Sequence, residues 1–129
     1  FYGDLVAAPG CIVALRAEGA PDGAGGFAGP HVVACFDPAT GAERWRYESP
    51  DEWGTFRPLV ADGSVVVGRE GEVVALDAGD GSPRWRLAVP GLPRGLGRDA
   101  GRLFVGTLQG RVSGFPWPKA APPAAPPRP

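Results

Sequence analysis

The sequence lacks, or is poor in, several residues on which common functions depend. It has no Met and no Asn, a single His and two Cys in 129 residues. Its 13 basic and 14 acidic side chains nearly cancel, which argues against nucleic-acid or membrane-surface binding, since both need clustered Lys and Arg. No apolar run approaches the roughly 20 residues that span a bilayer. Because Phe1 cannot be an initiator, we expect a mature, processed or excised piece of a protein.

Groups that could carry catalysis or bind a metal are also scarce. His31 follows Pro30 at the start of a predicted strand, with no second His, CxxC motif or paired carboxylates nearby, so we expect a surface or turn residue. No Ser has nucleophile-elbow spacing. The Asp77-x-x-Asp80-Gly81 segment lacks the alternating oxygen ligands and closing Glu of a calcium loop. We therefore expect no catalytic, cofactor-binding or metal-binding residues.

Glycine and proline are abundant, with 21 and 16 residues respectively. Such a content can indicate disorder. Outside the C-terminal tail, however, these residues fall between short runs rich in Val, Leu and Phe, as turns do in a chain of many short strands. No segment has a sustained 3.6-residue apolar period. The predicted class is all-β.

The chain repeats itself at a spacing of 40 residues. Residues 33–46 align with residues 73–86, and six of the 14 aligned positions are identical. Chance would give about one identity at ordinary residue frequencies. The identical pairs are Val33/Val73, Asp37/Asp77, Gly41/Gly81, Arg44/Arg84, Trp45/Trp85 and Arg46/Arg86.

A third copy is present only in part. Residues 65–73 recur with changes as residues 103–112. Pro116 then stands where Asp77 stood, and no Trp-bearing strand follows. The first copy is irregular too, because a Gly/Ala/Pro-rich insertion lies within residues 15–31.

Each copy is predicted to contain four short strands. In the second copy these are Leu59–Ala61, Ser64–Val67, Glu72–Leu76 and Arg84–Ala88. Asp and Gly in residues 77–81 suit the turn between the last two, since Asp accepts local N–H groups and Gly adopts positive φ. Four strands in about 40 residues, repeated, are typical of β-propeller blades. We therefore predict a partial β-propeller of about three blades of four-stranded antiparallel sheets, the third incomplete, at about residues 1–50, 51–90 and 91–115.

Residues 35–45 and 75–85 both begin with a small residue, carry Asp two positions later and Gly four beyond that, and end in Trp. This pattern resembles Ala-x-Asp-x-x-Thr-Gly-x-x-x-Trp, the tryptophan-docking motif of the PQQ-like (quinoprotein-type) β-propeller repeat family, and the resemblance covers most of residues 1–115. It implies that the Trp packs on the turn of the adjacent blade and that the Asp holds its own turn. The residues with these implied structural roles are Asp37, Gly41, Trp45, Asp77, Gly81 and Trp85.

The two cysteines are expected to be neighbours. If Gly68–Gly71 forms a four-residue turn, Ser64 pairs with Ala75, and the alignment places Cys11 and Cys35 at these two positions. Directly opposed residues have Cβ atoms about 4.5–5.5 Å apart. We therefore expect a disulfide, with two buried thiols as the alternative. The bond would indicate an oxidising compartment.

Residues 116–129 are predicted to form a separate tail, because seven of these 14 residues are proline. A Pro/Ala-rich segment favours polyproline II conformation and makes no ladder hydrogen bonds. Such a stiff segment suits docking along a partner protein, with packing on its own blades or a lattice contact as alternatives. The candidate partner-binding residues are Pro116, Trp117, Pro118, Pro122, Pro123, Pro126 and Pro127.

Two complete blades and a partial third do not close a propeller, which usually needs four to eight blades. We therefore expect a non-catalytic structural or protein-interaction module, an accessory subunit of a larger extracytoplasmic complex, periplasmic or secreted, held through blade surfaces and the tail. One alternative is a ligand-sensing domain excised from a larger receptor or kinase. Another is a fragment of a quinoprotein dehydrogenase. The family resemblance counts against this last alternative, because PQQ-binding members are much longer and use vicinal cysteines and Asn ligands, which this chain lacks.

Overall fold

The computed structural model describes residues 5–17, 30–55 and 57–118. Within these ranges the secondary structure consists of strands, and no helix has the length and apolarity that a membrane crossing requires. The strands are β1 (Val6–Ala8), β2 (Cys11–Ala17), β3 (His31–Phe36), β4 (Glu43–Ser49), β5 (Leu59–Ala61), β6 (Ser64–Arg69), β7 (Glu72–Asp77), β8 (Pro83–Ala88), β9 (Pro93–Asp99), β10 (Arg102–Thr107) and β11 (Val112–Pro116).

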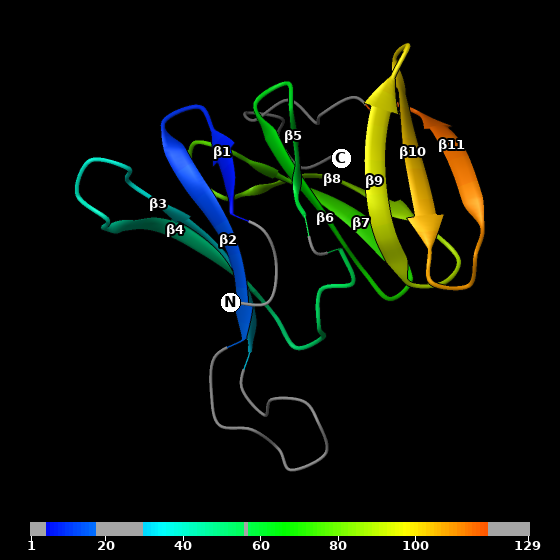
Figure 1. The fold of residues 1–129 in the computed structure, drawn as a ribbon, viewed down its shortest axis with the longest axis horizontal. Helices are drawn as coiled ribbons and strands as arrows, with labels where there is room; N and C mark the ends of the chain where they lie inside the picture. Colours follow the sequence, from blue (N-terminus) through cyan, green and yellow to red (C-terminus); the bar gives the residue numbers. More distant parts are fainter. Residues whose placement is uncertain (1–4, 18–29, 56, 119–129) are drawn as a thin grey trace, which may run out of the picture.

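The strands form three antiparallel sheets, here called blades. Blade 1 has the order β1-β2-β3-β4, blade 2 has β5-β6-β7-β8, and blade 3 has β9-β10-β11. Figure 1 shows the blades side by side in sequence order, and β1 contacts β5 while β6 contacts β9. The predicted all-β partial propeller, with an incomplete third blade, is confirmed.

The strands of blade 2 lie where the sequence predicts them, but the hairpin between β6 and β7 is tighter. Arg69 pairs with Glu72, so the turn has two residues rather than four, and Ser64 pairs with Asp77 instead of Ala75. Gly68 belongs to the strand. A Cβ there would lie 2.6 Å from the Cβ of Pro93, so this glycine serves close packing rather than a turn.

The core is divided between the two junctions that join the blades. Because side chains alternate across a strand, blade 2 turns Val65, Val67 and Leu76 toward blade 1, and Val66 and Val73 toward blade 3. All five side chains are fully buried. Blade 2 is thus packed on both of its faces.

The predicted start of the tail is wrong by its first two residues. Pro116 is the last residue of β11 and pairs with Arg102, and the Trp117 N–H donates to the Gly101 carbonyl at 3.0 Å. Proline is tolerated here because β11 is an edge strand. The predicted tail residues Pro122, Pro123, Pro126 and Pro127, like most of the insertion in the first copy, lie outside the described residues.

Candidate interaction surfaces

Trp45 makes the junction between blades 1 and 2. This β4 side chain is buried, and its Nε1–H donates to the Ala78 carbonyl at 3.0 Å. Its ring lies on Gly81, where a Cβ would come within 2.5 Å of the ring. The turn is held by Asp77, whose Oδ1 accepts the Gly79 N–H at 2.7 Å and whose carbonyl accepts the Gly81 N–H at 2.7 Å. The motif residues therefore lie together at a contact between two blades.

The equivalent turn of blade 1, residues 37–41, has the same internal hydrogen bonds but no tryptophan ring packed against it. Asp37 Oδ1 accepts the Ala39 N–H at 2.8 Å, as Asp77 does in blade 2. Gly41 has φ of +75°, close to the +79° of Gly81, but no atom lies within 4 Å of its potential Cβ position. Within the described ranges this turn is thus an uncovered copy of the one that Trp45 covers.

Blades 2 and 3 meet through a different aromatic contact. The rings of Trp85 and Trp117 are 5.5 Å apart and nearly perpendicular, at 82°. Trp117 of blade 3 is equivalent in position to Ala78 of blade 2. The Ala78 N–H donates to the Gly63 carbonyl, and the Trp117 N–H donates in the same way to the Gly101 carbonyl. The Arg98 guanidinium lies 4.2 Å from the Trp117 ring centroid. Trp117, predicted to bind a partner, therefore packs against its own blades.

Cys11 and Cys35 are close together as free, buried thiols, and the expected disulfide is not present. The register of β2 with β3, which matches that of β6 with β7, explains why. Cys35 pairs with Val13 rather than with Cys11, so the cysteines are diagonal neighbours, and diagonal pairs are typically about 7–8 Å apart. Burial, followed by interaction with the Cys11 side chain, raises the pKa of Cys35 to about 12.

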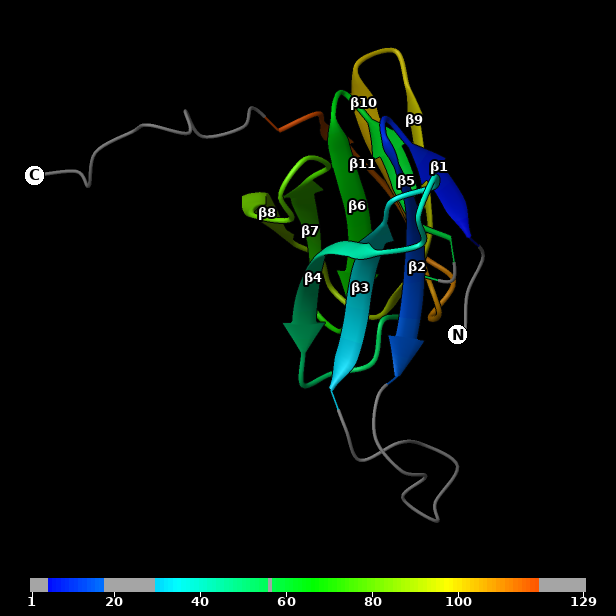
Figure 2. The same ribbon diagram turned by 90° about the vertical axis from the view of Figure 1, so that its left-hand side faces the viewer.

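The face of blade 1 turned away from blade 2 carries a cluster of charged side chains, and Figure 2 shows this sheet face-on. The cluster consists of Arg16, Glu43, Arg46 and Glu48. Arg16 and Arg46 both contact Glu43, with N–O distances of 3.2 and 3.1 Å. Beneath them lie the fully buried Ala14, Val32 and Ala34. This surface is polar and largely neutralised within itself.

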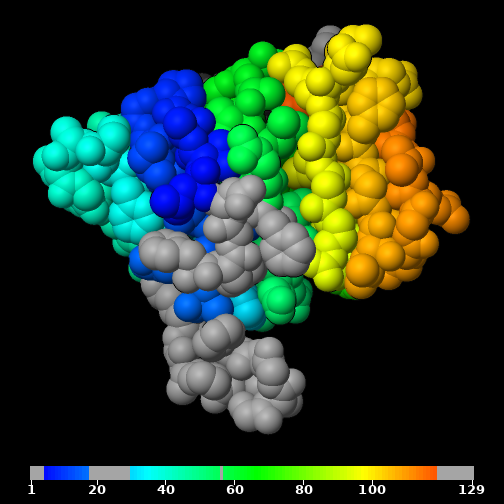
Figure 3. All heavy atoms as spheres, viewed as in Figure 1, coloured from blue at the N-terminus to red at the C-terminus, as the bar shows by residue number. Residues whose placement is uncertain are grey.

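The open side of blade 3 differs from that of blade 1. Figure 3 shows β10 and β11, in orange, at one end of the molecule. Phe104, Leu108 and Val112 are 38%, 57% and 76% exposed. Gly95, Gly97 and Gly106 have no side chain to cover the sheet, and no atom lies within 4 Å of their potential Cβ positions. An apolar side chain beside bare backbone is a surface that another protein can cover.

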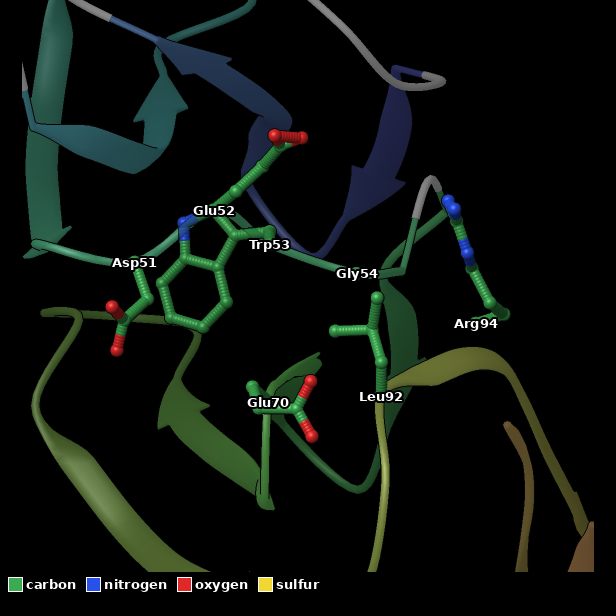
Figure 4. Close-up of a pocket in the computed structure, with 7 residues that line it drawn as sticks. All are labelled: Asp51, Glu52, Trp53, Gly54, Glu70, Leu92 and Arg94. Carbon is green, nitrogen blue, oxygen red and sulfur yellow. The ribbon is translucent and has the colours of Figure 1, made fainter. Parts of the chain in front are cut away.

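A pocket of about 300 Å³ lies where the connection between blades 1 and 2 meets the start of blade 3. Its lining is Asp51, Glu52, Trp53, Gly54, Glu70, Leu92 and Arg94, as Figure 4 shows. The lining has three carboxylates and one guanidinium but no Ser, Cys, His or Lys. Sequence reasoning missed this pocket. The only signal was Trp53, a tryptophan outside the repeated motif.

The described residues contain no group of three or more His, Cys, Asp or Glu side chains placed to hold a metal ion. Cys11 and Cys35 lie on neighbouring strands rather than side by side in the sequence. His31, predicted to lie at the surface or in a turn, is instead the buried first residue of β3, 7% exposed.

Two solved structures show which known folds this chain is similar to. BamB from Moraxella catarrhalis matches with a TM-score of 0.67 and 19% identity, over 89% of this chain and 32% of that one. A europium-containing methanol dehydrogenase matches with a TM-score of 0.57 and 15% identity, over 92% of this chain and 24% of that one. The chain therefore spans about a third or less of the length of these proteins. Both matches concern the fold.

Comparison with curated proteins finds no match. A family model of PQQ-type repeats, described as outer membrane protein assembly factor BamB, matches residues 30–115, which is more than half of the chain. The matched residues include both tryptophan-docking motifs and most of blade 3. The chain belongs to this BamB-like family of PQQ-type propeller repeats.

Proposed function

We propose that this chain is a non-catalytic protein-interaction module, an accessory subunit of a larger extracytoplasmic complex. The family supports this proposal, because its description names an outer membrane assembly factor. The same description supports an extracytoplasmic location.

The observation that carries the proposal is the difference between the two open sides of the molecule. Blade 1 ends in a charged cluster that water can solvate. Blade 3 ends in three strands with Phe104, Leu108 and Val112 exposed. Terminal units of a repeat stack usually carry a polar outer face. Blade 3 lacks one, as expected of a surface that another molecule covers.

The mass of the material purified without denaturation tests the proposal. We expect a mass well above 13.3 kDa that includes other polypeptides. A single species of 13.3 kDa would contradict the proposal, because the open side would then be stable uncovered. A small multiple of that mass would contradict the accessory role and indicate association of identical chains.

Matched substitutions locate the surface that holds the complex. Phe104→Ser and Leu108→Ser together should release the partners, because they remove apolar area from the open side of blade 3. Leu5→Ser is the control, since Leu5 is 60% exposed before blade 1. The native mass should fall to that of the free chain for the first variant only. Equal behaviour of the two variants would place the contact elsewhere.

A further inference from the structure

One edge of blade 3 offers backbone groups for pairing. The Thr107 N–H donates to the Arg111 carbonyl at 2.9 Å, and the Trp117 N–H donates to the Gly101 carbonyl at 3.0 Å. In an antiparallel ladder these two bonds direct the N–H and C=O groups of Val112 and Gly114 away from β10. Among the described residues no strand pairs with that side of β11. The edge is available for a further strand.

The two complete blades show what fits such an edge. In each, the third strand pairs with a fourth, and a small residue lies opposite the motif tryptophan, in the pairs Cys35–Trp45 and Ala75–Trp85. Gly114 is the equivalent position of β11, since Phe104 pairs with it as Val66 pairs with Ala75. Gly114 is thus the small residue that would face the aromatic side chain of a fourth strand, and the Phe104 ring, 3.1 Å from its potential Cβ position, lies beside it.

The sequence that directly follows β11 is unsuited to be this fourth strand. Proline has no N–H to donate, and it occupies seven of the positions 116–129. Residues 116–129 therefore do not encode a consecutive fourth strand like those of blades 1 and 2. A strand from outside these residues is needed to pair with the edge.

Charge indicates the chemistry of that strand. In blade 2, Arg84 of β8 donates to Ser64 Oγ at 2.8 Å, and Arg86 donates to Glu72 Oε1 at 3.0 Å. The repeat places Arg102 at the position of Ser64 and Arg111 at the position of Glu72. Both residues are exposed, and the structure records no ion pair for either within the described ranges. An Arg-bearing strand such as β8 would meet like charge here, whereas an acidic one would be attracted.

We propose that the edge of β11 binds an extended acidic and aromatic segment of another protein as the fourth strand of blade 3. The segment runs antiparallel to β11, with its aromatic residue opposite Gly114 and carboxylates beside Arg102 and Arg111. It displaces the 3.3 Å hydrogen bond that Arg102 now donates to the Gly114 carbonyl. A second copy of this chain is disfavoured, because its own fourth strands carry arginine on both sides of the motif tryptophan, as Arg44 and Arg46 in β4 and Arg84 and Arg86 in β8. The inference rests on the proposed function and specifies the partner.

Peptides derived from β8 test the pairing on the full chain. The first has the sequence of residues 81–90 with Arg84→Glu and Arg86→Glu, and its control keeps both arginines. At low salt the acidic peptide should bind about tenfold more tightly by fluorescence anisotropy, since two exposed ion pairs replace two repulsive ones. A third peptide, acidic with Trp85→Ala, should lose most of the binding. Equal binding of the acidic and basic peptides, or no binding, would overturn the proposal.

Amide hydrogen exchange by NMR locates the binding site. The acidic peptide should slow exchange at Val112 and Gly114, the two amides at the open edge. Val112→Pro removes one of these N–H groups and should weaken binding much more than Val112→Thr, which keeps the N–H group. Protection confined to other residues, such as the pocket around Trp53, would contradict the assigned site.

Exchanging the charges provides a test that does not depend on proline at the edge. Arg102→Glu with Arg111→Glu should reverse the preference, so that the basic peptide binds more tightly than the acidic one. An unchanged preference would exclude these arginines from recognition. If no peptide binds while the native mass still shows a complex, the strand-pairing inference fails and the proposed function stands. If the purified chain is a free species of 13.3 kDa that binds the acidic peptide, the edge of β11 pairs with a strand as inferred, but the proposed function fails.

Discussion

Gly41 and Gly81 occupy equivalent turns and differ only in what lies above them. Both have positive φ, and only Gly81 has a tryptophan ring on its potential Cβ position. We expect Gly81→Ala to destabilise the protein more than Gly41→Ala. Both variants incur the left-handed backbone cost of about 1–2 kcal/mol, and Gly81→Ala adds about 1–3 kcal/mol of overpacking against Trp45.

Urea unfolding of the two glycine variants measures the difference directly. Because the backbone cost is common to both, the extra loss in Gly81→Ala reports the contact with Trp45. Equal losses would show that the ring does not press on Gly81 in solution. A larger loss for Gly41→Ala would mean that something covers the turn of blade 1.

The raised pKa of Cys35 makes stability depend on alkaline pH. The pKa of the Cys35 thiol is about 12 in the folded protein and 9.0 in the unfolded chain, so the unfolded chain loses this proton first as pH rises. The free energy of unfolding does not depend on this thiol below about pH 9. Between pH 9 and 12 it falls by at most about 1.4 kcal/mol per pH unit. Cys35→Ala, which installs the residue of blade 2, should remove this slope. Parallel pH profiles for the two proteins above pH 9 would contradict the assignment.

At the scale of elements, β11 is attached to the rest of the molecule partly through Trp117. Trp117→Ala removes the edge-to-face contact with Trp85 and the cation–π contact with Arg98. We expect a loss of about 2 kcal/mol and a weaker near-ultraviolet circular dichroism signal from Trp85. Trp117→Phe should lose less, because it keeps an aromatic ring at the junction. A neutral Trp117→Ala variant would show that blade 3 is held without it.

Strand positions could be predicted from the sequence, whereas strand register could not. The strands of blade 2 follow from alternating apolar runs and from the turn residues between them. The predicted partner of Ser64 was wrong by two residues, because Gly68 was assigned to the turn. Gly68 instead lies in the strand, where the absence of a side chain lets Pro93 pack closely. That role depends on blade 3 and is invisible within one hairpin. The same error placed Cys11 directly opposite Cys35.

At the scale of the whole molecule, the blades should differ in stability according to how many faces are packed. Blade 2 is covered on both sides, and blades 1 and 3 on one. Native-state hydrogen exchange should therefore be slowest in β6 and β7 and fastest in β9–β11, where no fourth strand is described. Measurement by mass spectrometry resolves the blades. Protection of blade 3 equal to that of blade 2 in the isolated chain would contradict this order.

The candidate surfaces were only partly predictable from the sequence. The motif tryptophans could be predicted because the repeat keeps them, and the prolines after Phe115 already indicate that blade 3, as far as it is described, has three strands. The charged face of blade 1 and the pocket depend on side chains far apart in the chain, from Arg16 to Glu48 and from Asp51 to Arg94. No local pattern marks such groups before the fold brings them together.

The charged cluster of blade 1 has a consequence for stoichiometry. Repeats that join head to tail through unlike faces extend into fibres unless the ring closes. For a copy to add to blade 1, Arg16, Glu43 and Arg46 would have to leave water, and the small apolar residues beneath them, Ala14, Val32 and Ala34, offer little area in return. We therefore expect a neighbour to add more readily at blade 3 than at blade 1.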